Sequence, residues 1–354
     1  MSNDSPGVIS SGLPEAVAKL LADAGLGGWY SIRFLRSGGN NRVYRLDVRG
    51  KALLLKAYFE HPDDPRDRLG TEFAFSWFAW NHGLHSLPQP LARDPRHHLG
   101  LYEFVNGRKL RPDEVSSGAV RQALMFIGEL NLHKHLPDAQ QLPRASEACF
   151  SLAEHLACVE SRIQRLSNLD DNSPLVREVL RFVRGDLSTA WNQVALGLHQ
   201  RSLRCGWSLV EELPVFRRCL SPSDFGFHNA LLADDGRLRF LDFEYAGWDD
   251  PAKLVCDFFC QPAIPVPLHF YDVVVQQVAA IFNDAALPTR IGLLLPVCQL
   301  KWCCILLNDF LPLGRRRRFF AGGKAAQEEQ RASQLQKARQ VLHNLATPAL
   351  VRSA

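Results

Sequence analysis

The sequence predicts an α+β fold of two lobes: a small β-rich N-terminal lobe (residues 1–105) and a large, mostly helical C-terminal lobe (residues 106–354). The chain has 354 residues, which is longer than one typical domain. Apolar residues recur at strand spacing in much of the first part and at helical spacing over most of the second. Hydrophobic residues make up 46% and charged residues 22%, as in globular proteins with a sizeable core. We therefore expect two packed lobes with a cleft between them.

Strand and helix patterns follow one another in the N-terminal lobe. A short helix, PEAVAKLLADAG, precedes the strand WYSIRFL. Alternating apolar residues on both sides of the Arg49-Gly50 turn predict a β-hairpin over VYRLDVRGKALLLKAY. The segment RDRLGTEFAFSWFAWNHG has helical spacing and stops at Gly83, where a helix C-cap belongs. The run LGLYEFV, before the Asn106-Gly107 turn, predicts another strand.

Helical spacing dominates the C-terminal lobe. Only the segment 214–244 breaks it, with short apolar runs separated by turns such as Asp235-Gly236. The sequence contains no internal repeat and no low-complexity segment. We expect helices over roughly 113–136, 146–167, 175–201, 268–283, 287–310 and 323–345.

Composition excludes several classes of protein. The net charge of +4 comes without an RNA-binding signature, so no nucleic-acid partner is expected. Nine cysteines, an odd number without C-x-x-C pairs, are typical of small buried side chains in a reducing compartment. The N-terminus lacks a secretory signal, and the apolar stretch IGLLLPVCQLKWCCILL is broken by Pro296, Gln299 and Lys301, which favours a buried helix over a membrane span. We expect a cytoplasmic location; the oligomeric state stays open.

Two N-terminal motifs are suited to holding a nucleotide. Phosphoryl transfer from ATP needs a glycine-lined turn over the phosphates and a fixed cation. In the turn SGGNN, which a plain hairpin could also explain, Gly38, Gly39 and Asn40 would bring backbone N–H groups to phosphate oxygens. Lys56 ends the apolar run ALLLK and needs a carboxylate partner, for which Glu72 and Glu60 are the candidates.

Three polar residues between positions 224 and 242 are the strongest candidates for catalysis. A carboxylate at Asp224, within hydrogen-bond reach of an acceptor hydroxyl, would orient this group and accept its proton. The Asn229 amide oxygen on the same loop and the Asp242 carboxylate, reached through the hairpin ALLADDGRLRFLDF, could bind Mg²⁺. Polar groups beside buried strands are costly to keep without a role, which favours a functional interpretation.

The segments DFGFHNALL and LRFLDFEYAGWDDP resemble the catalytic and metal-binding segments of the aminoglycoside phosphotransferase and choline kinase family, which has a protein-kinase-like fold. The resemblance extends from about residue 30 to 260. It implies ATP and Mg²⁺ as cofactors and a hydroxyl of a small molecule as the acceptor. It also implies Asp224 as catalytic base, Asn229 and Asp242 as Mg²⁺ ligands, Lys56 braced by Glu72 on the phosphates, and backbone groups of Glu103, Phe104 and Val105 on the adenine.

One position departs from the family pattern. The family usually has a histidine two residues before the catalytic aspartate, where this chain has Pro222, followed by Ser223. Because that histidine mainly supports the loop, the resemblance still implies the same class of reaction. The departure leaves open a pseudokinase that binds nucleotide without chemistry.

The acceptor is the least defined part of the sequence. The run Arg315 to Arg318 suits an anionic partner, although a solvated loop or helix C-cap contacts would also explain it. We expect a sugar or sugar derivative, neutral or anionic, with an aminoglycoside or a choline-type amino alcohol as alternatives. Carboxylates for an aminoglycoside could come from Glu211, Glu212, Asp249, Asp250 and Asp309, and an aromatic cage for choline from Trp191, Trp248, Tyr271 and Trp302.

Overall fold

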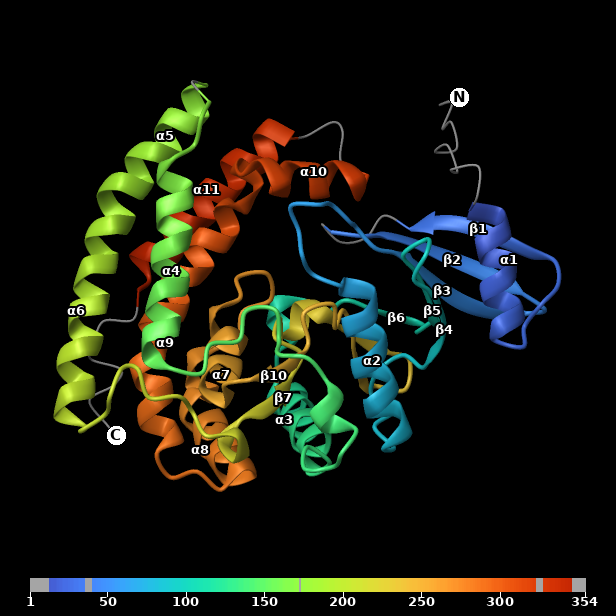
Figure 1. The fold of residues 1–354 in the computed structure, drawn as a ribbon, viewed down its shortest axis with the longest axis horizontal. Helices are drawn as coiled ribbons and strands as arrows, with labels where there is room; N and C mark the ends of the chain where they lie inside the picture. The colour runs from blue at the N-terminus through green and yellow to red at the C-terminus, as the bar shows by residue number, and fades with distance from the viewer. Residues whose placement is uncertain (1–12, 36–39, 172, 323–326, 346–354) are drawn as a thin grey trace.

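The computed structural model describes residues 13–35, 40–171, 173–322 and 327–345. It shows the two-lobed α+β arrangement that the sequence predicts, with a β-sheet lobe beside a larger helical lobe (Figure 1). The last strand of the N-terminal sheet ends at Glu103. The division of the chain between residues 105 and 106 stays a prediction.

The N-terminal lobe is built on a five-stranded antiparallel sheet in the order β1-β2-β3-β5-β4. The hairpin expected around Arg49 and Gly50 is confirmed, since Val48 pairs with Lys51 and both turn residues have positive φ (48° and 76°). The five strands of the sheet are β1 (Tyr30–Leu35), β2 (Arg42–Val48), β3 (Lys51–Ala57), β4 (Pro90–Asp94) and β5 (Leu99–Glu103).

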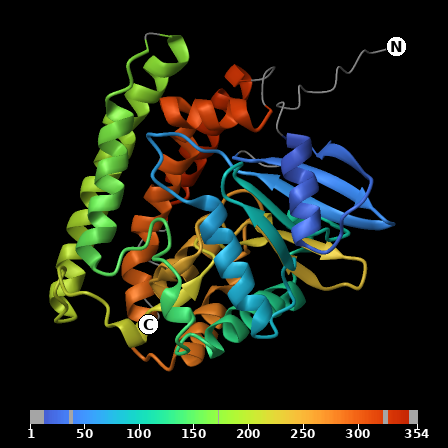
Figure 2. The same cartoon turned by 45° about the vertical axis from the view of Figure 1, so that its right-hand side comes forward.

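Two helices belong to this lobe. α1 (Leu13–Asp23) lies on one face of the sheet and closes a small apolar core with it (Figure 2). α2 (Arg68–Asn81) begins at Asp67, whose carboxylate accepts a hydrogen bond from the Gly70 N–H at 2.8 Å. The buried aromatic residues of α2 belong to the core of the large lobe. α2 therefore joins the two lobes.

A second hairpin, β8 (Ala230–Ala233) and β9 (Leu238–Phe240), forms a small sheet with β6 (Gly107–Arg108). Ala230 pairs with Phe240, so the residues just outside the hairpin lie opposite each other. There the Leu241 N–H donates to the Asn229 carbonyl at 2.8 Å. The hairpin thus returns the chain to the loop from which it started.

A third pair of strands, β7 (Cys219–Ser221) and β10 (Gly247–Asp249), leaves no room for a side chain at Gly247. Gly247 has φ 151°, and a Cβ there would lie 2.2 Å from the Pro143 carbonyl oxygen and 2.8 Å from the Ala145 nitrogen. Both are backbone atoms that cannot turn away. Glycine is therefore required at this crossing of two segments.

Helices fill the remainder of the large lobe, and α4, α5 and α6 form its side farthest from the sheet (Figure 1). Three helices of this lobe start after a capping serine: Ser116 before α3, Ser151 before α4 and Ser173 before α5. The helices are α3 (Ser117–Leu132), α4 (Leu152–Ser167), α5 (Pro174–Phe182), α6 (Ser188–Arg204), α7 (Pro251–Cys260), α8 (Tyr271–Phe282), α9 (Leu287–Leu306), α10 (Pro312–Phe320) and α11 (Gln327–His343).

α9 is the central helix of this lobe and packs against α4, α6, α7 and α11. Within the described residues, Leu287–Phe310 is the one helical stretch long and apolar enough to cross a membrane by composition. However, 67% of its most apolar window is buried inside the protein. The expectation of a buried helix is confirmed. Seven of the nine cysteines are also buried, and no disulfide joins these nine described residues.

Several helix boundaries differ from the sequence expectation. The helix expected over 175–201 is two helices, α5 and α6, joined by a π-helical turn at Val183–Leu187. α7 lies where no helix was expected, although Asp250 caps it and Pro251 occupies its first turn. The four arginines at 315–318 are part of α10, so the interpretation as a solvated loop is wrong.

α10 also contacts the N-terminal lobe. The Arg42 Nε donates to the Phe320 carbonyl at 2.6 Å, and the Phe320 ring packs against Phe59 with centroids 5.6 Å apart. Arg316 lies 3.7 Å from the Asp63 carboxylate. α10 thus contacts the start of β2 and the loop that follows β3, and Figure 1 shows it beside this end of the sheet.

Candidate active site

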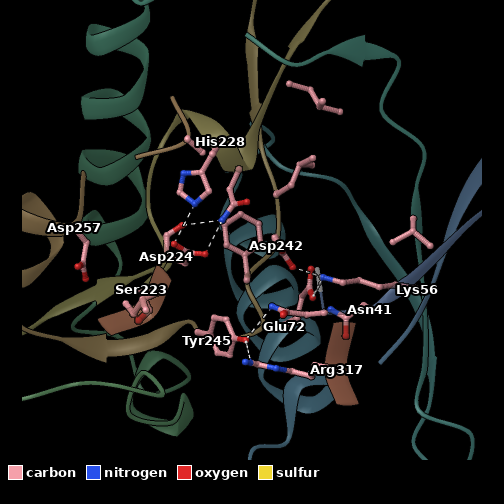
Figure 3. Close-up of a pocket in the computed structure, with 18 of the residues that line it drawn as sticks. Asn41, Lys56, Glu72, Ser223, Asp224, His228, Asp242, Tyr245, Asp257 and Arg317 are labelled. Atoms are coloured by element: carbon pink, nitrogen blue, oxygen red, sulfur yellow. Dashed lines mark hydrogen bonds and ion pairs between the residues drawn. The ribbon is translucent and has the colours of Figure 1, made fainter. Parts of the chain in front are cut away.

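A cavity of about 870 Å³ opens between the lobes. It brings together most of the residues singled out in the sequence: Asn40, Lys56, Glu72, Glu103, Phe104, Val105, Asp224, Asn229 and Asp242 all line it. Gly38 and Gly39 lie outside the described residues. Figure 3 shows Lys56, Glu72 and Asp242 on one side of this cavity and Asp224 with His228 on the other.

Lys56 binds two carboxylates that come from different lobes. Its ammonium lies 2.6 Å from Glu72 Oε2 and 2.5 Å from Asp242 Oδ1. Glu72 rather than Glu60 is therefore the partner on the N-terminal side, while Glu60 contacts His98. β3 and α2 place this pair, and residue 242 follows the second hairpin.

The ion pair between Lys56 and Glu72 is almost closed to water. Lys56 and Glu72 are each 6% exposed. Burial raises the pKa of Glu72 to about 6, against the attraction of Lys56. Although burial opposes it, the Lys56 ammonium holds the pKa of Asp242 below its usual range. The Tyr58 hydroxyl donates to Glu72 at 2.8 Å and helps to satisfy the buried carboxylate.

Asp224 is held from two sides in a short loop. His228 Nε2 donates to its Oδ1 at 3.1 Å, and Asn229 Nδ2 donates to its Oδ2 at 3.2 Å and to its backbone carbonyl at 3.0 Å. Because the Asn229 nitrogen faces Asp224, the amide oxygen of Asn229 is turned away from that carboxylate. The Asp224 carboxylate is about one-third exposed, open to a ligand in the cavity.

Asn229 and Asp242 are brought together by the hairpin between them. The Leu241 N–H donates to the Asn229 carbonyl, and Asp242 is the next residue in the chain. Asn229 and Asp242 therefore lie near each other. Asp242 itself has φ 67°, a left-handed conformation that an aspartate tolerates better than most residues. The turn directs its carboxylate toward Lys56 and the cavity.

The loop before Asp224 is supported without the histidine that the family usually has. Ser223 has φ 66°, and its backbone N–H donates to the Ser221 hydroxyl at 2.9 Å. The buried Lys253 donates to the Ser223 hydroxyl at 3.2 Å and to Asp249 at 2.5 Å. Ser221, Ser223 and the α7 residue Lys253 therefore hold this loop in place.

The described end of the glycine turn is fastened to the large lobe. Asn40 and Asn41 each donate to the Glu244 carboxylate at 2.7 Å, and Glu244 is fully buried. The Asn40 side chain is thus engaged, so a contact of Asn40 with phosphate would come from its backbone. Glu244 follows Asp242 by two residues. Its bonds to Asn40 and Asn41 therefore connect the glycine turn to the segment beside Lys56.

The other end of the cavity is an apolar slot. Phe104 and Val105 continue from β5 as the single-chain link between the lobes, and both line the slot with Glu103. The flat space between the N-terminal sheet and the second hairpin suits a planar ring. Its apolar walls are Leu35, Val43 and Leu54 from the N-terminal sheet and Leu231 and Leu241 from the second hairpin and its end.

The donor set of the site fits Mg²⁺. Mg²⁺ prefers oxygen ligands and usually takes only one or two carboxylates from protein, with phosphates and water completing its shell. The Asp242 carboxylate and the Asn229 amide oxygen are of this kind. In the described ranges, no group of three or more His, Cys, Asp or Glu side chains forms a separate metal site.

Sequence reasoning missed three residues of the cavity. His228 stands in the quoted motif DFGFHN but was given no role, and its contact with Asp224 depends on the fold of the loop. Lys109, exposed after β6, donates to the His228 carbonyl at 2.5 Å. Tyr245 accepts from Asn40 at 3.1 Å. No spacing in the sequence connects Lys109 to position 228, since only the pairing of β6 with β8 brings them together.

Few of the expected acceptor-binding residues reach the cavity. Of the five candidate carboxylates only Asp309 lines it, and of the four candidate aromatic residues only Trp302 does. Asp249 and Asp250 are completely buried, and their partners are Lys253 and Arg290. The candidate residues thus contribute one carboxylate, Asp309, and one aromatic ring, Trp302, to the cavity.

The four arginines of α10 point to different places. Arg317 and Arg318 line the cavity, whereas Arg315 and Arg316 do not. Arg315 lies 3.9 Å from Asp171, Arg316 contacts the N-terminal lobe, and Arg318 donates to Asp309 at 3.0 Å. The expectation of four arginines facing one partner is thus wrong, since two of the four line the cavity and one of these two, Arg318, is paired with Asp309.

The fold of the chain is similar to solved structures of small-molecule kinases. The chain is similar along almost all its length to a choline/ethanolamine kinase family protein from Mesorhizobium loti (19% identity, TM-score 0.55, covering 96% of this chain and 97% of that one). It is also similar to a spectinomycin phosphotransferase in complex with ADP and spectinomycin (12%, 0.61, 92% and 98%) and to a macrolide 2'-phosphotransferase from Brachybacterium faecium (16%, 0.55, 88% and 99%). At these identities the likeness shows the fold alone.

The sequence itself carries the family assignment. No curated protein matches the chain. Residues 31–259, more than half of the chain, match the phosphotransferase enzyme family. This segment runs from β1 through the second hairpin to α7 and includes every described residue of the Lys56 and Asp224 groups. The chain therefore belongs to the phosphotransferase enzyme family, whose members are small-molecule kinases.

Proposed function

We propose that the protein transfers the γ-phosphate of ATP, with Mg²⁺, to a hydroxyl of a sugar or sugar derivative. The observation that carries this proposal is the convergence of two charge groups on one cavity. Lys56 with Asp242 lies on the side of the apolar slot, and Asp224 lies on the side of the helical lobe. A nucleotide in the slot would extend its phosphates along Lys56 toward Asp224.

Each residue has a role that its contacts suit. Glu103, Phe104 and Val105 hold the adenine in the slot, and the glycine turn with Asn40 covers the phosphates. Lys56, braced by Glu72, binds the phosphate oxygens. Asn229 and Asp242 would hold Mg²⁺, which would supply positive charge to the phosphates.

Asp224 is the proposed base. Its hydrogen bonds with His228 and Asn229 fix the carboxylate before any acceptor arrives. An acceptor hydroxyl within hydrogen-bond reach of Asp224 is thereby aimed at the γ-phosphate, and its proton passes to the carboxylate as the new bond forms.

The cavity favours a sugar over the two amino alternatives. A polycationic acceptor needs several free carboxylates, but the acids on this wall are already paired: Asp257 with Lys301 and Asp309 with Arg318. A choline-type cation needs a cage of aromatic faces. Trp302 lines the cavity, but its Nε1 donates to Asp257 at 2.9 Å and it has no other member of the expected cage beside it.

The test is ADP release together with product mass. Purified protein would receive Mg²⁺-ATP and a panel of sugars, amino sugars, sugar acids, aminoglycosides and choline-like alcohols. We expect one phosphate to be added to a sugar-type acceptor and this activity to be lost in Asp224→Asn. Asp234→Asn, an exposed carboxylate in the turn of the second hairpin, is the matched control.

Three outcomes would change the proposal. Phosphorylation of aminoglycosides or choline alone would replace the acceptor class. Near-normal turnover in Asp224→Asn would exclude Asp224 as the base. Mg²⁺-dependent nucleotide binding without transfer to any acceptor would favour a nucleotide-binding protein without catalysis.

A further inference from the structure

Away from the apolar slot, Lys109 and the ion pairs of Lys56 with Glu72 and Asp242, the cavity wall holds more cationic than anionic side chains. Its cations are Arg66, Arg162, Lys253, Lys301, Arg317 and Arg318. Its carboxylates, Asp224 included, are Glu147, Asp224, Asp257 and Asp309. Six cations thus face four carboxylates. The question is which of the six are neutralised by the protein itself.

Four of these cations have close carboxylate partners. Lys253 and Lys301 share Asp257, at 3.3 Å and 2.7 Å, and Lys253 also contacts the fully buried Asp249. Arg318 pairs with Asp309. Arg66 forms two parallel hydrogen bonds with Asp64, at 2.6 Å and 2.9 Å. These four need no ligand to be stable in the wall.

Arg162 on α4 is different, because it is buried and only partly neutralised. Arg162 is 8% exposed to solvent. Its Nη2 contacts Glu147, which is itself partly exposed. Its Nε is buried without a hydrogen-bond partner among the described residues. Burial lowers the pKa of Arg162 to about 10, and the nearby cation Arg66 acts in the same direction. A buried guanidinium with an unused N–H group is unfavourable unless an anion completes its contacts.

Arg317 on α10 is the second cation of this kind. Within the described ranges no carboxylate lies at ion-pair distance from it, and its one side-chain contact is with the Tyr245 hydroxyl at 3.4 Å (Figure 3). Its Nε is also buried without a partner in the described part of the chain. Arg66 stands over the Tyr245 ring at 5.3 Å. Arg66 and Arg317 therefore contact the same tyrosine, and Arg66, Arg162 and Arg317 all line the one cavity.

Building on the proposed phosphotransfer, we infer that the acceptor is an anionic molecule whose carboxylate or phosphate group binds Arg162 and Arg317. A guanidinium presents a planar fork of N–H groups that matches both kinds of oxyanion. With its anionic group on these arginines, the acceptor would fill the helical side of the cavity and leave a hydroxyl free for Asp224. Sugar acids and phosphorylated sugars have this combination of groups.

The nucleotide phosphates are a less suitable anion for this pair. They have their own cations in Lys56 and Lys109, on the side of the slot and of Asp242. The two unsatisfied arginines stand on α4 and α10, elements that make no part of the slot, but Arg317 shares the Tyr245 hydroxyl with Asn40 of the glycine turn. A test must therefore keep the nucleotide site filled while it examines the arginines.

The experiment measures thermal stabilisation by bare oxyanions. Protein saturated with Mg²⁺ and a non-hydrolysable ATP analogue would be titrated with inorganic phosphate in one arm and acetate in the other, against chloride at equal ionic strength. We expect the melting temperature to rise with at least one of these anions, because a ligand that binds only the folded state stabilises it. The arm with the larger rise identifies the group that the site prefers.

Two pairs of variants give the controls. Arg162→Gln and Arg317→Gln should weaken the anion affinity by about tenfold or more. Arg165→Gln, one turn along α4, and Arg316→Gln, which neighbours Arg317 outside the cavity, should leave it unchanged. If Arg162→Gln fails to fold, Arg317→Gln at its half-exposed position still decides the question. No anion-specific rise in the wild type, or a rise retained in both cavity variants, would overturn the inference.

Turnover separates this inference from the proposed function. In the transfer assay, Arg317→Gln should raise the acceptor KM about tenfold for an anionic acceptor and leave the ATP KM unchanged. Efficient transfer to neutral sugars, with kcat/KM unchanged in Arg317→Gln, would overturn the anionic acceptor and leave the phosphotransfer intact. An anion site that behaves as expected, in a protein that transfers phosphate to nothing, would support the site and contradict the proposed function.

Discussion

Replacing Lys56 with Met would remove the cation that two carboxylates share. Lys56 lies 2.6 Å from Glu72 and 2.5 Å from Asp242, and Glu72 is 6% exposed. Removing one partner of a buried ion pair typically costs about 3–5 kcal/mol of unfolding free energy, because the other charge stays buried and unpaired. We therefore expect Lys56→Met to position the phosphates poorly. We also expect its unfolding free energy near pH 8 to fall by this amount.

The cost should depend on pH through Glu72. Its pKa is raised from 4.5 to about 6 even with Lys56 present. A folded-state pKa above the unfolded one means that the stabilising protonated form is complete below pH 4.5 and is lost as the pH rises through about 6. The interval from 4.5 to 6 corresponds to about 2 kcal/mol. Without Lys56 this pKa should rise further, so lowering the pH from 8 to 5 should stabilise the variant more than it stabilises the wild type, and the gap between the two unfolding free energies should narrow.

The assay is urea unfolding at pH 5 and pH 8 for the wild type, Lys56→Met and Lys56→Met with Glu72→Gln. The double variant carries no buried charge at Glu72, so it should recover much of the stability at pH 8 without recovering ADP release. Lys109→Met, a cavity lysine whose contact is with a backbone carbonyl, is the control for removing a cation. An equal loss at both pH values, or no recovery in the double variant, would refute this reasoning.

Three further variants test separate parts of the site and fold. Asp242→Asn should lower turnover on the order of 100-fold and also weaken Mg²⁺-ATP binding, measured by titration with and without Mg²⁺; unchanged Mg²⁺ dependence would exclude Asp242 as a ligand. His228→Ala should lower kcat about tenfold or more by releasing the Asp224 carboxylate, with little change in the ATP KM and partial rescue in His228→Gln; an equal rise in KM would point to substrate contact instead. Gly247→Ala should cost on the order of 3 kcal/mol in urea unfolding because its Cβ meets backbone atoms at 2.2 Å and 2.8 Å, whereas Gly185→Ala, with no atom within 4 Å, should be nearly neutral.

The local features of the sequence predicted the elements that carry the site. The period-2 pattern around Arg49-Gly50 and the helical pattern ending at Gly83 both appear where expected, since short hairpins and amphipathic helices are set by neighbouring residues. The need of a buried cation for a counter-charge predicted a carboxylate partner for Lys56, and the family resemblance implied Glu72 rather than Glu60, which the structure confirms.

Other features depend on contacts that sequence spacing does not reveal. Asp242 also binds Lys56, and His228 reaches back to Asp224, because loop conformation decides both contacts. The candidate acids and aromatic residues for the acceptor were chosen by residue type, and the fold pairs or buries most of them elsewhere. Arg317 and its neighbour Arg316 show the limit most clearly, because adjacent residues of one helix serve the cavity and the opposite lobe respectively.

The double duty of α10 has a consequence for redesign of the protein. Nine residues supply both Arg317 in the cavity wall and the Phe320 and Arg316 contacts that hold the sheet. A graft that exchanged this helix for that of a relative, in order to import a new acceptor preference, would also replace the fastening between the lobes. Successful transplants would keep positions 316 and 320 and vary only positions 317 and 318, the two arginines of this helix that line the cavity.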